Sequence, residues 1–338
     1  MRSSNLQQAV RPTMRALVQQ SADGPDDLAL VPDHPRPSPG PGEYLVRVGA
    51  AGVNFADTMQ TRGTYGGGPA APYVAGFEAA GEIVGVGADV EDPLPVGTHV
   101  IGVGPGAYAE YVPMPAAGVL EVPGGWTDAQ ALGLVLNWMT AVAALRPLGQ
   151  VGDGDVVLVH AAAGGVGQAA VRAARHYGAR VVATASPRKH DLVRGLGVDL
   201  VLDPASPRLA EQVLDAVGPV DVVLESVGRT TFDASLAVAK PYAGTVVVFG
   251  AASGDASVTT ADLVFRHRVR IAGLHIGSLA VSAPATYLSV LDDVATLIAA
   301  GVYPPGTPHV HRLADGPVVL HEMEAGRTTG KHALDPRR

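Results

Sequence analysis

The stretch Asp155-Val-Val-Leu-Val-His160 is followed by Ala161-Ala-Ala-Gly-Gly-Val-Gly167 and then by Gln168-Ala-Ala-Val-Arg-Ala-Ala-Arg175. The first run is apolar and β-branched, which predicts a buried strand, and the last has apolar residues at helical spacing. The small residues between them predict a tight turn in which glycine lets the backbone approach a ligand. The N–H groups and positive dipole end of such a helix suit a pyrophosphate. We therefore expect cofactor contacts from Ala163, Gly164, Gly165, Val166 and Gly167.

The segments that follow repeat this alternation of strand and helix. Short apolar runs at 179–184, 200–202, 221–225, 244–249 and 269–274 predict five more strands, and helices are expected at 188–196 and 209–217. Alternating strands and helices pack as a parallel sheet covered on both faces. The prediction is a doubly wound sheet of six strands.

Composition narrows the class of protein. The 338 residues are 47% hydrophobic, which favours two domains with sizeable cores. The net charge is −8 with no clustered basic stripe, so no nucleic-acid partner is expected. The N-terminus lacks the apolar core of a signal peptide, and we find no apolar run that would span a bilayer, so we expect a cytoplasmic protein without a membrane partner. Because the chain has no Cys, thiolate zinc sites are excluded.

The rest of the chain predicts a second, β-rich domain. Residues 1–13 show no periodicity and are expected to be a disordered tail, and 31–42 to be an extended connection. Strands are expected at 14–19, 43–48, 81–87, 96–101 and 107–112, with no helix of length among them. Helices are expected at 126–145, where Thr127 is the N-cap, at 284–300 and at 316–325.

Several motifs in order carry a resemblance to a known family. They are Asn54-Phe-Ala-Asp57, Arg62-Gly-Thr-Tyr65, Gly76-Phe-Glu-Ala-Ala-Gly81, the turn at 161–167, Glu225-Ser-Val-Gly228 and Gly326-Arg-Thr-Thr-Gly-Lys331. Together they resemble the zinc-independent quinone oxidoreductase branch of the medium-chain dehydrogenase/reductase superfamily. The resemblance implies an α/β protein with a GroES-like β-barrel catalytic domain at 14–136 and 276–338. It also implies a Rossmann NADP-binding domain at 137–275, a cofactor in the cleft between the two, and a homodimer.

The resemblance also allows a prediction of whether the chain binds a catalytic zinc ion. In zinc-dependent relatives the catalytic metal is held by a Cys where this chain has Asn54 and by a His where it has Phe77. A phenyl ring cannot ligate, so we expect no zinc. Glu78 is read as a buried carboxylate held by local hydrogen bonds rather than as a catalytic group.

The end of the second Rossmann strand indicates which nicotinamide cofactor binds. NAD enzymes usually carry an acid there for the ribose 2′-OH, whereas this chain has Ser186 followed by Arg188 and Lys189. A hydroxyl and cations would stabilise a 2′-phosphate, which favours NADPH, although solvated helix-start residues are the alternative. A family Tyr or His at this phosphate is replaced by Pro204. Further cofactor contacts are expected from Phe249, Gly250, His275 and, by the resemblance, Lys331.

The resemblance implies hydride transfer to a small electron-poor substrate, a quinone or an α,β-unsaturated carbonyl compound. Asn54 and Thr140 match positions at the nicotinamide and substrate, and the proton is expected from water, Tyr65 or a hydroxyl relay. Met59 and Asn137 stand where relatives carry Tyr and Lys. Two alternatives therefore remain open: a biosynthetic tailoring reductase or cyclase for a specific conjugated intermediate, and a non-catalytic NADPH-binding protein.

Overall fold

The computed structural model describes residues 12–338, so the expected tail at 1–13 lies almost wholly outside the described residues. The chain forms two compact units. The first contains the chain up to Leu132 together with Gly306–Arg327 and Lys331–Arg338, and the second contains Gly133–Pro305 and Thr328–Gly330. The predicted division at 276 differs from this, because residues 276–305 pack with the second unit.

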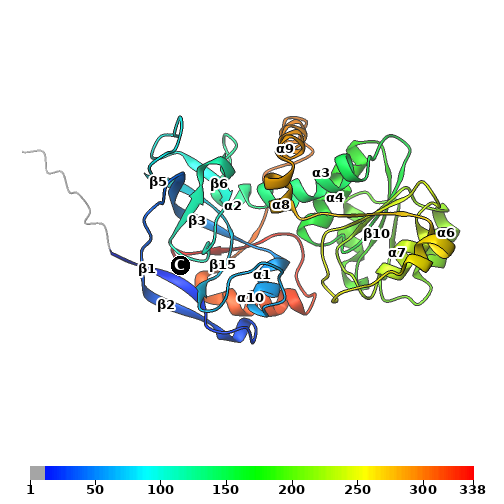
Figure 1. Ribbon diagram of the computed structural model, residues 1–338, viewed down its shortest axis with the longest axis horizontal. Coiled ribbons are helices and arrows are strands. Elements are labelled where there is room, and N and C mark those ends of the chain that lie inside the picture. The colour runs from blue at the N-terminus through cyan, green and yellow to red at the C-terminus, as the bar shows by residue number, and fades with distance from the viewer. Residues whose placement is uncertain (1–11) are drawn as a thin grey trace, which may run out of the picture. The chain divides into compact units, whose positions relative to one another are not determined.

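The second unit is built on the six predicted strands. They are β9 (Val156–Val159), β10 (Arg180–Thr184), β11 (Leu200–Leu202), β12 (Val222–Glu225), β13 (Thr245–Val248) and β14 (Arg270–Gly273). All pair in parallel in the order β11-β10-β9-β12-β13-β14, which is the doubly wound topology with β9 inside the sheet. Figure 1 shows this unit with β10 labelled in its sheet. The predicted six-stranded parallel sheet is confirmed.

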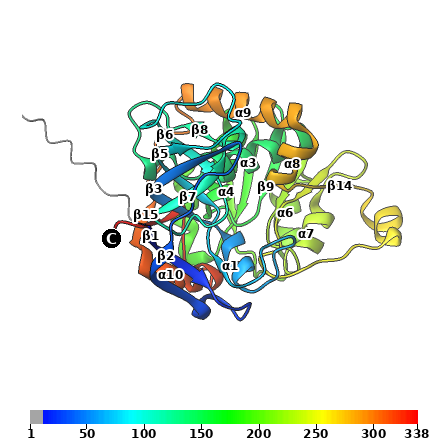
Figure 2. The ribbon, with the colours of Figure 1, turned by 60° about the vertical axis from the view of Figure 1, so that its left-hand side comes forward.

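Helices lie on both faces of this sheet. On one face Leu158 and Val223 pack with residues of α6 (Leu209–Val217) and α7 (Phe232–Val238) in one apolar cluster. On the other face lies α4 (Gly165–His176), whose alanines are buried. The short α5 (His190–Gly195) follows a 3₁₀ turn, η5 (Pro187–Lys189). After β14 come α8 (Ile276–Ser282) and α9 (Pro284–Ala299), which pack against α3 (Met139–Ala143), as Figure 2 shows.

The helix expected at 126–145 is not continuous. Thr127 caps α2 (Asp128–Ala131) as predicted, but the chain then turns at Gly133, which has φ of +93°. The helix resumes as a π-helical turn, η3 (Leu134–Trp138), continues as α3 and ends in a second π-turn, η4 (Ala144–Leu148). Contrary to our expectation, Asp128–Leu148 has the length and hydropathy of a membrane span; 67% of its apolar window is buried inside the protein, as in the core helix of a fold.

The first unit is mostly antiparallel β-structure. Its larger sheet has the order β15-β16-β3-β5-β6-β8, with β7 also paired to β3, and its smaller sheet has the order β2-β1-β4. The bounds are β1 (Thr13–Gln19), β2 (Leu28–Pro35), β3 (Glu43–Val53), β4 (Tyr73–Val74), β5 (Glu78–Val86), β6 (His99–Val103), β7 (Tyr111–Pro115), β8 (Leu120–Glu121), β15 (His309–Arg312) and β16 (His332–Asp335). Val46, Val48 and Ile83 from the central strands lie in its apolar core.

Three features of this unit differ from the prediction. Part of the expected connection at 31–42 is the strand β2, which pairs with β1. A helix that we did not expect, α1 (Phe55–Thr61), follows β3, and the strand expected at 107–112 begins only at Tyr111. The predicted C-terminal helix is present as α10 (Gly316–Glu324).

Candidate functional site

The turn between β9 and α4 leaves the start of a long helix open. Gly164 is the N-cap and has no side chain with which to cap the helix. A Cβ on Gly167 would lie 2.4 Å from the carbonyl oxygen of Ala161 and 2.6 Å from Cα of Ala162, so only glycine lets the helix pack on the turn. A Cβ on Gly164 would meet nothing closer than 3.4 Å. The first-turn N–H groups, including those of Gly165 and Val166, can therefore face an anion.

A segment from the far end of the chain lies beside this turn. The N–H of Gly330 donates to the carbonyl of Ala163 over 2.8 Å, and Gly330 forms a parallel bridge with Gly164. Lys189 Nζ donates to the carbonyl of Thr328 over 2.7 Å. Residues 328–330 thus contribute to the candidate nucleotide site of the second unit.

Ser186, Arg188 and Lys189, which were predicted to bind a 2′-phosphate, lie together after β10. The Oγ of Ser186 is buried and has no hydrogen-bond partner among residues 12–338. Burial, and secondly the neighbouring charge of Arg188, lower the pKa of Lys189. An anion bound here would accept from Ser186 and offset both effects on Lys189. The residues present therefore fit a phosphate.

The other predicted cofactor residues of the second unit lie at strand ends or on a helix. Phe249 and Gly250 follow β13, and a Cβ on Gly250 would lie 2.8 Å from the carbonyl oxygen of Ser226. His275 follows β14 and caps α8, since its Nδ1 accepts from the N–H of Ser278 over 3.0 Å. Thr140 lies on α3 and is half-buried. The carboxyl ends of β13 and β14 are where ligands bind in such sheets.

In the first unit, Asn54, Glu78 and Lys331 form a closed set of hydrogen bonds. Lys331 Nζ donates to Asn54 Oδ1 over 2.7 Å and pairs with Glu78 Oε2. Asn54 Nδ2 donates to the same carboxylate oxygen over 2.9 Å. The amide of Asn54 is thus held by a cation and an anion. This ion pair was not predicted, and its only signal in the sequence was the two motifs that carry Glu78 and Lys331.

Asp57 lies behind Asn54 in α1. Its Oδ2 accepts from the N–H of Asn54 over 2.7 Å and from the hydroxyl of Tyr108 over 2.8 Å, and its other oxygen is buried without a partner among the described residues. Burial raises the pKa of Asp57 to about 7, against the lowering effect of those bonds and of Lys331. Asp57 therefore holds the loop at Asn54, and its carboxyl group changes protonation state near neutral pH.

Tyr65 is half-buried, and its ring stacks on Phe77 with centroids 6.4 Å apart. Burial, and secondly the charge of Asp57, raise the pKa of Tyr65. Tyr65 thus lies beside Phe77, the residue that stands where zinc-dependent relatives carry a metal-binding His. Asn54, Tyr65 and Lys331 belong to the first unit, and all other predicted site residues belong to the second.

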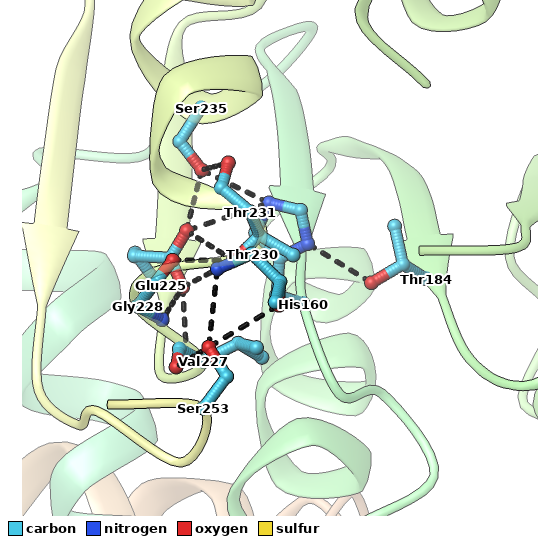
Figure 3. A network of polar contacts seen from close by, with 9 residues as sticks. All are labelled: His160, Thr184, Glu225, Val227, Gly228, Thr230, Thr231, Ser235 and Ser253. Atoms are coloured by element: carbon cyan, nitrogen blue, oxygen red, sulfur yellow. Dashed lines mark hydrogen bonds and ion pairs between the residues drawn. The ribbon is translucent and has the colours of Figure 1, made fainter. Parts of the chain in front are cut away.

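A buried polar network that we did not predict lies where β9 and β12 end, next to the glycine-rich turn (Figure 3). Glu225 accepts from the N–H groups of Val227 and Gly228 and from the hydroxyls of Thr231 and Ser235. His160 lies between Ser235, 3.0 Å from Nε2, and Thr184, 2.9 Å from Nδ1. Burial lowers the pKa of His160 and Glu225 opposes this. The network fixes the strand ends that carry the turn.

The donor atoms of the first unit do not suit zinc. Within residues 12–338, no three His, Cys, Asp or Glu side chains converge in a way that could hold a metal. Phe77 has no donor atom, and Asn54 Oδ1 already accepts from an ammonium group whose charge would repel a metal ion. The residues present therefore do not fit a catalytic zinc site.

Comparison with known proteins gives matches to both units. Residues 40–124 match the family model described as alcohol dehydrogenase GroES-like domain, and residues 165–296 match the model described as zinc-binding dehydrogenase. The mycocerosic acid synthase-like polyketide synthase of Mycobacterium tuberculosis is 38% identical over 307 residues, which are 89% of this chain and 14% of that protein. The chain spans 14% or less of the length of the curated polyketide synthases that it matches.

Solved structures match over nearly the whole chain. Mycobacterial Rv1454c complexed with NADPH is 33% identical with a TM-score of 0.89, covering 96% of this chain and 100% of that one. The quinone oxidoreductase of Pseudomonas syringae pv. Tomato is 32% identical with a TM-score of 0.88 and the same coverage. CurK enoyl reductase is 27% identical with a TM-score of 0.84, covering 96% of this chain and 99% of that one. These matches confirm the predicted fold class.

Proposed function

Because the chain belongs to the quinone oxidoreductase branch of the medium-chain dehydrogenase/reductase superfamily, we propose that it is an NADPH-dependent reductase of quinones or α,β-unsaturated carbonyl compounds. The observation that carries the proposal is the buried hydroxyl of Ser186, which has no hydrogen-bond partner in the described part of the chain and lies beside Arg188 and Lys189. The mycobacterial and Pseudomonas relatives support it, since one is complexed with NADPH and the other is a quinone oxidoreductase.

In this proposal the second unit holds the phosphates of NADPH. The pyrophosphate lies at the N-terminus of α4, against the turn of Ala163, Gly164, Gly165, Val166 and Gly167. Ser186, Arg188 and Lys189 hold the 2′-phosphate. The rest of the cofactor site in this unit is lined by Phe249, Gly250 and His275. For the nicotinamide we retain Asn54, Thr140 and Lys331. NADPH, when bound, supplies the hydride.

The protein residues of the site orient the acceptor. Asn54 presents an amide fixed by Glu78 and Lys331, and Thr140 offers a hydroxyl that can hold a carbonyl oxygen. Tyr65 and Phe77 offer an aromatic surface on which a flat acceptor can stack. Metal assistance has no place in this mechanism, because Asn54 and Phe77 do not supply a zinc donor set.

A second candidate is the reduction of an enoyl group in a biosynthetic chain. The 38% identity to part of a polyketide synthase and the similarity to an enoyl reductase favour it. The chemistry is the same hydride addition to a conjugated carbonyl, but the substrate is a specific intermediate. Both candidates share the cofactor and the site, and they differ in the acceptor that is turned over.

We further propose that the protein is a cytoplasmic homodimer that joins through β14. This strand ends the sheet order, so its outer edge is open within the described chain. Exposed apolar side chains lie shortly before this strand in the chain, Phe265 at 76% and Val264 at 58% exposure, and Ile271 lies on the strand itself. A two-fold axis at this edge would pair two copies of β14 and cover these side chains.

The test is a fluorescence titration with NADPH and NADH, followed by absorbance assays with 1,4-benzoquinone and with an enoyl thioester of N-acetylcysteamine. We expect NADPH to bind at least tenfold more tightly than NADH, and Ser186→Asp to abolish that preference by placing a carboxylate against the 2′-phosphate. Ser282→Asp, at an exposed helix end, is the matched control.

Each outcome of these assays points to one candidate. Turnover of benzoquinone supports the quinone reductase, and turnover of the thioester alone supports the biosynthetic enzyme. Tight NADPH binding without turnover of any acceptor would leave a non-catalytic NADPH-binding protein. A preference for NADH would refute the proposed phosphate site.

A further inference from the structure

The proposed reaction needs an acid that protonates the substrate after hydride transfer. The hydrogen-bonded set of Asn54, Glu78 and Lys331 contains such a group. Glu78 is fully buried, and the side chain of Lys331 is only 11% exposed. A cation remains charged at such a place when a carboxylate pairs with it. The fold makes room for the pair, because a Cβ on Gly52 would lie 2.3 Å from Glu78 Oε2 and 3.1 Å from Cε of Lys331.

An ammonium group carries three protons, and the contacts with Asn54 and Glu78 engage two of them. Within residues 12–338 these are the two side-chain acceptors of the ammonium, so its third N–H can donate to a substrate oxygen. The amide of Asn54, which touches the same ammonium, cannot release a proton itself. Asn54 and Lys331 are also the two residues of the first unit that we assign to the nicotinamide.

We propose that Lys331 is the acid that protonates the substrate after hydride transfer. This inference rests on the proposed function. Hydride addition to the β-carbon of an enone, or to a quinone, places negative charge on the carbonyl oxygen. The Nζ–H bond of Lys331 then breaks, a new O–H bond forms on that oxygen, and Lys331 becomes a neutral amine. Water restores its proton, and an enol product tautomerises to the saturated carbonyl compound.

The surrounding groups favour Lys331 over the other candidate acids. Tyr65 has a raised pKa because of its burial and of Asp57, so it gives up its proton less readily than an ordinary phenol. Asp57 is buried, with its Oδ2 engaged by Asn54 N–H and Tyr108. The charged groups that face Lys331 are Glu78, in direct contact, and Asp57, whose pKa Lys331 lowers. Glu78 pairs with the ammonium of Lys331, and the negative charge that develops on the substrate oxygen attracts its proton.

The decisive variant is Lys331→Arg, because a guanidinium keeps the charge and the pairing with Glu78 but does not release a proton at neutral pH. Using whichever of benzoquinone and the enoyl thioester the wild type reduces faster, we expect kcat to fall at least about 100-fold, within the range for loss of a general acid. The Kd for NADPH should change less than threefold. The solvent deuterium isotope effect on kcat should change, because water then supplies the proton.

Lys331→Met tests the same point without the charge, and Lys331→Met with Glu78→Gln removes the buried unpaired carboxylate in case the single variant does not fold. Both should resemble Lys331→Arg in kcat. Wild-type kcat and isotope effect in Lys331→Arg would overturn the inference and leave Lys331 an electrostatic role. Loss of NADPH binding in Lys331→Arg would also overturn it, because the role of Lys331 would then be confined to the cofactor contact already proposed. If the wild type reduces neither acceptor, it is the proposed function that fails.

Discussion

Asp57 should make the protein less stable as the pH rises through neutrality. Its pKa in the folded protein is about 7, raised from 3.8 by burial. Between these values the folded state holds a proton that the unfolded state has lost, so the free energy of unfolding falls as pH rises. Each pH unit in this window is worth about 1.4 kcal/mol, so the loss between pH 5 and pH 8 is about 2 to 3 kcal/mol.

Replacing Asp57 with Asn removes this dependence and keeps an oxygen that can accept from Asn54 N–H and from Tyr108. The free energy of unfolding of Asp57→Asn, relative to that of the wild type, should therefore be about 2 to 3 kcal/mol higher at pH 8 than at pH 5. Urea unfolding at a series of pH values, followed by tryptophan fluorescence, measures this difference. Asp191→Asn, at a side chain that is 99% exposed, is the control for the same chemical change. Parallel pH profiles for Asp57→Asn and the wild type would refute the burial argument.

Two further predictions concern the second unit. Gly167→Ala should cost about 1 to 3 kcal/mol of stability and weaken NADPH binding, because the added Cβ meets backbone atoms of the turn. Gly164→Ala is the control, because a Cβ has room there, and it should change the melting temperature little. Equal effects of the two substitutions would contradict the packing argument. Phe265→Asp should convert a dimer into monomers in sedimentation experiments, whereas Val318→Asp, at a position on α10 that is 63% exposed, should not. A dimer that survives Phe265→Asp would exclude this edge.

The sequence predicted the second unit well because its signals are local. The central strands of the parallel sheet are buried on both faces, so each is a short apolar run such as Val156–Val159. The helix α6 was found at its observed bounds, Leu209–Val217. The strand β2 was missed because Pro32 and Pro35 predict an irregular connection, yet a proline is tolerated at a sheet edge. The helix α1 was missed although Asn54 and Asp57 have the spacing of a capping pair.

The site was predictable only where it follows from neighbouring residues in the chain. The glycines of the turn and the group at Ser186, Arg188 and Lys189 could be found from local sequence. The pairing of Glu78 with Lys331 joins residues 253 positions apart, and the motifs that carry them do not indicate that the two side chains meet. The break at Gly133 also escaped prediction, because an isolated glycine is tolerated within many helical patterns.

The short segment Thr328–Gly330 affects how this protein can be divided experimentally. A fragment containing only residues 133–305 would keep all six parallel strands, but the carbonyl of Ala163 would lose the N–H of Gly330, and the ammonium of Lys189 would lose the carbonyl of Thr328. Such a fragment would expose the back of the glycine-rich turn and release a cation of the proposed phosphate site. Cofactor affinity measured on the fragment would therefore underestimate that of the whole chain. A fragment to which a short linker adds residues 328–330 should regain both hydrogen bonds.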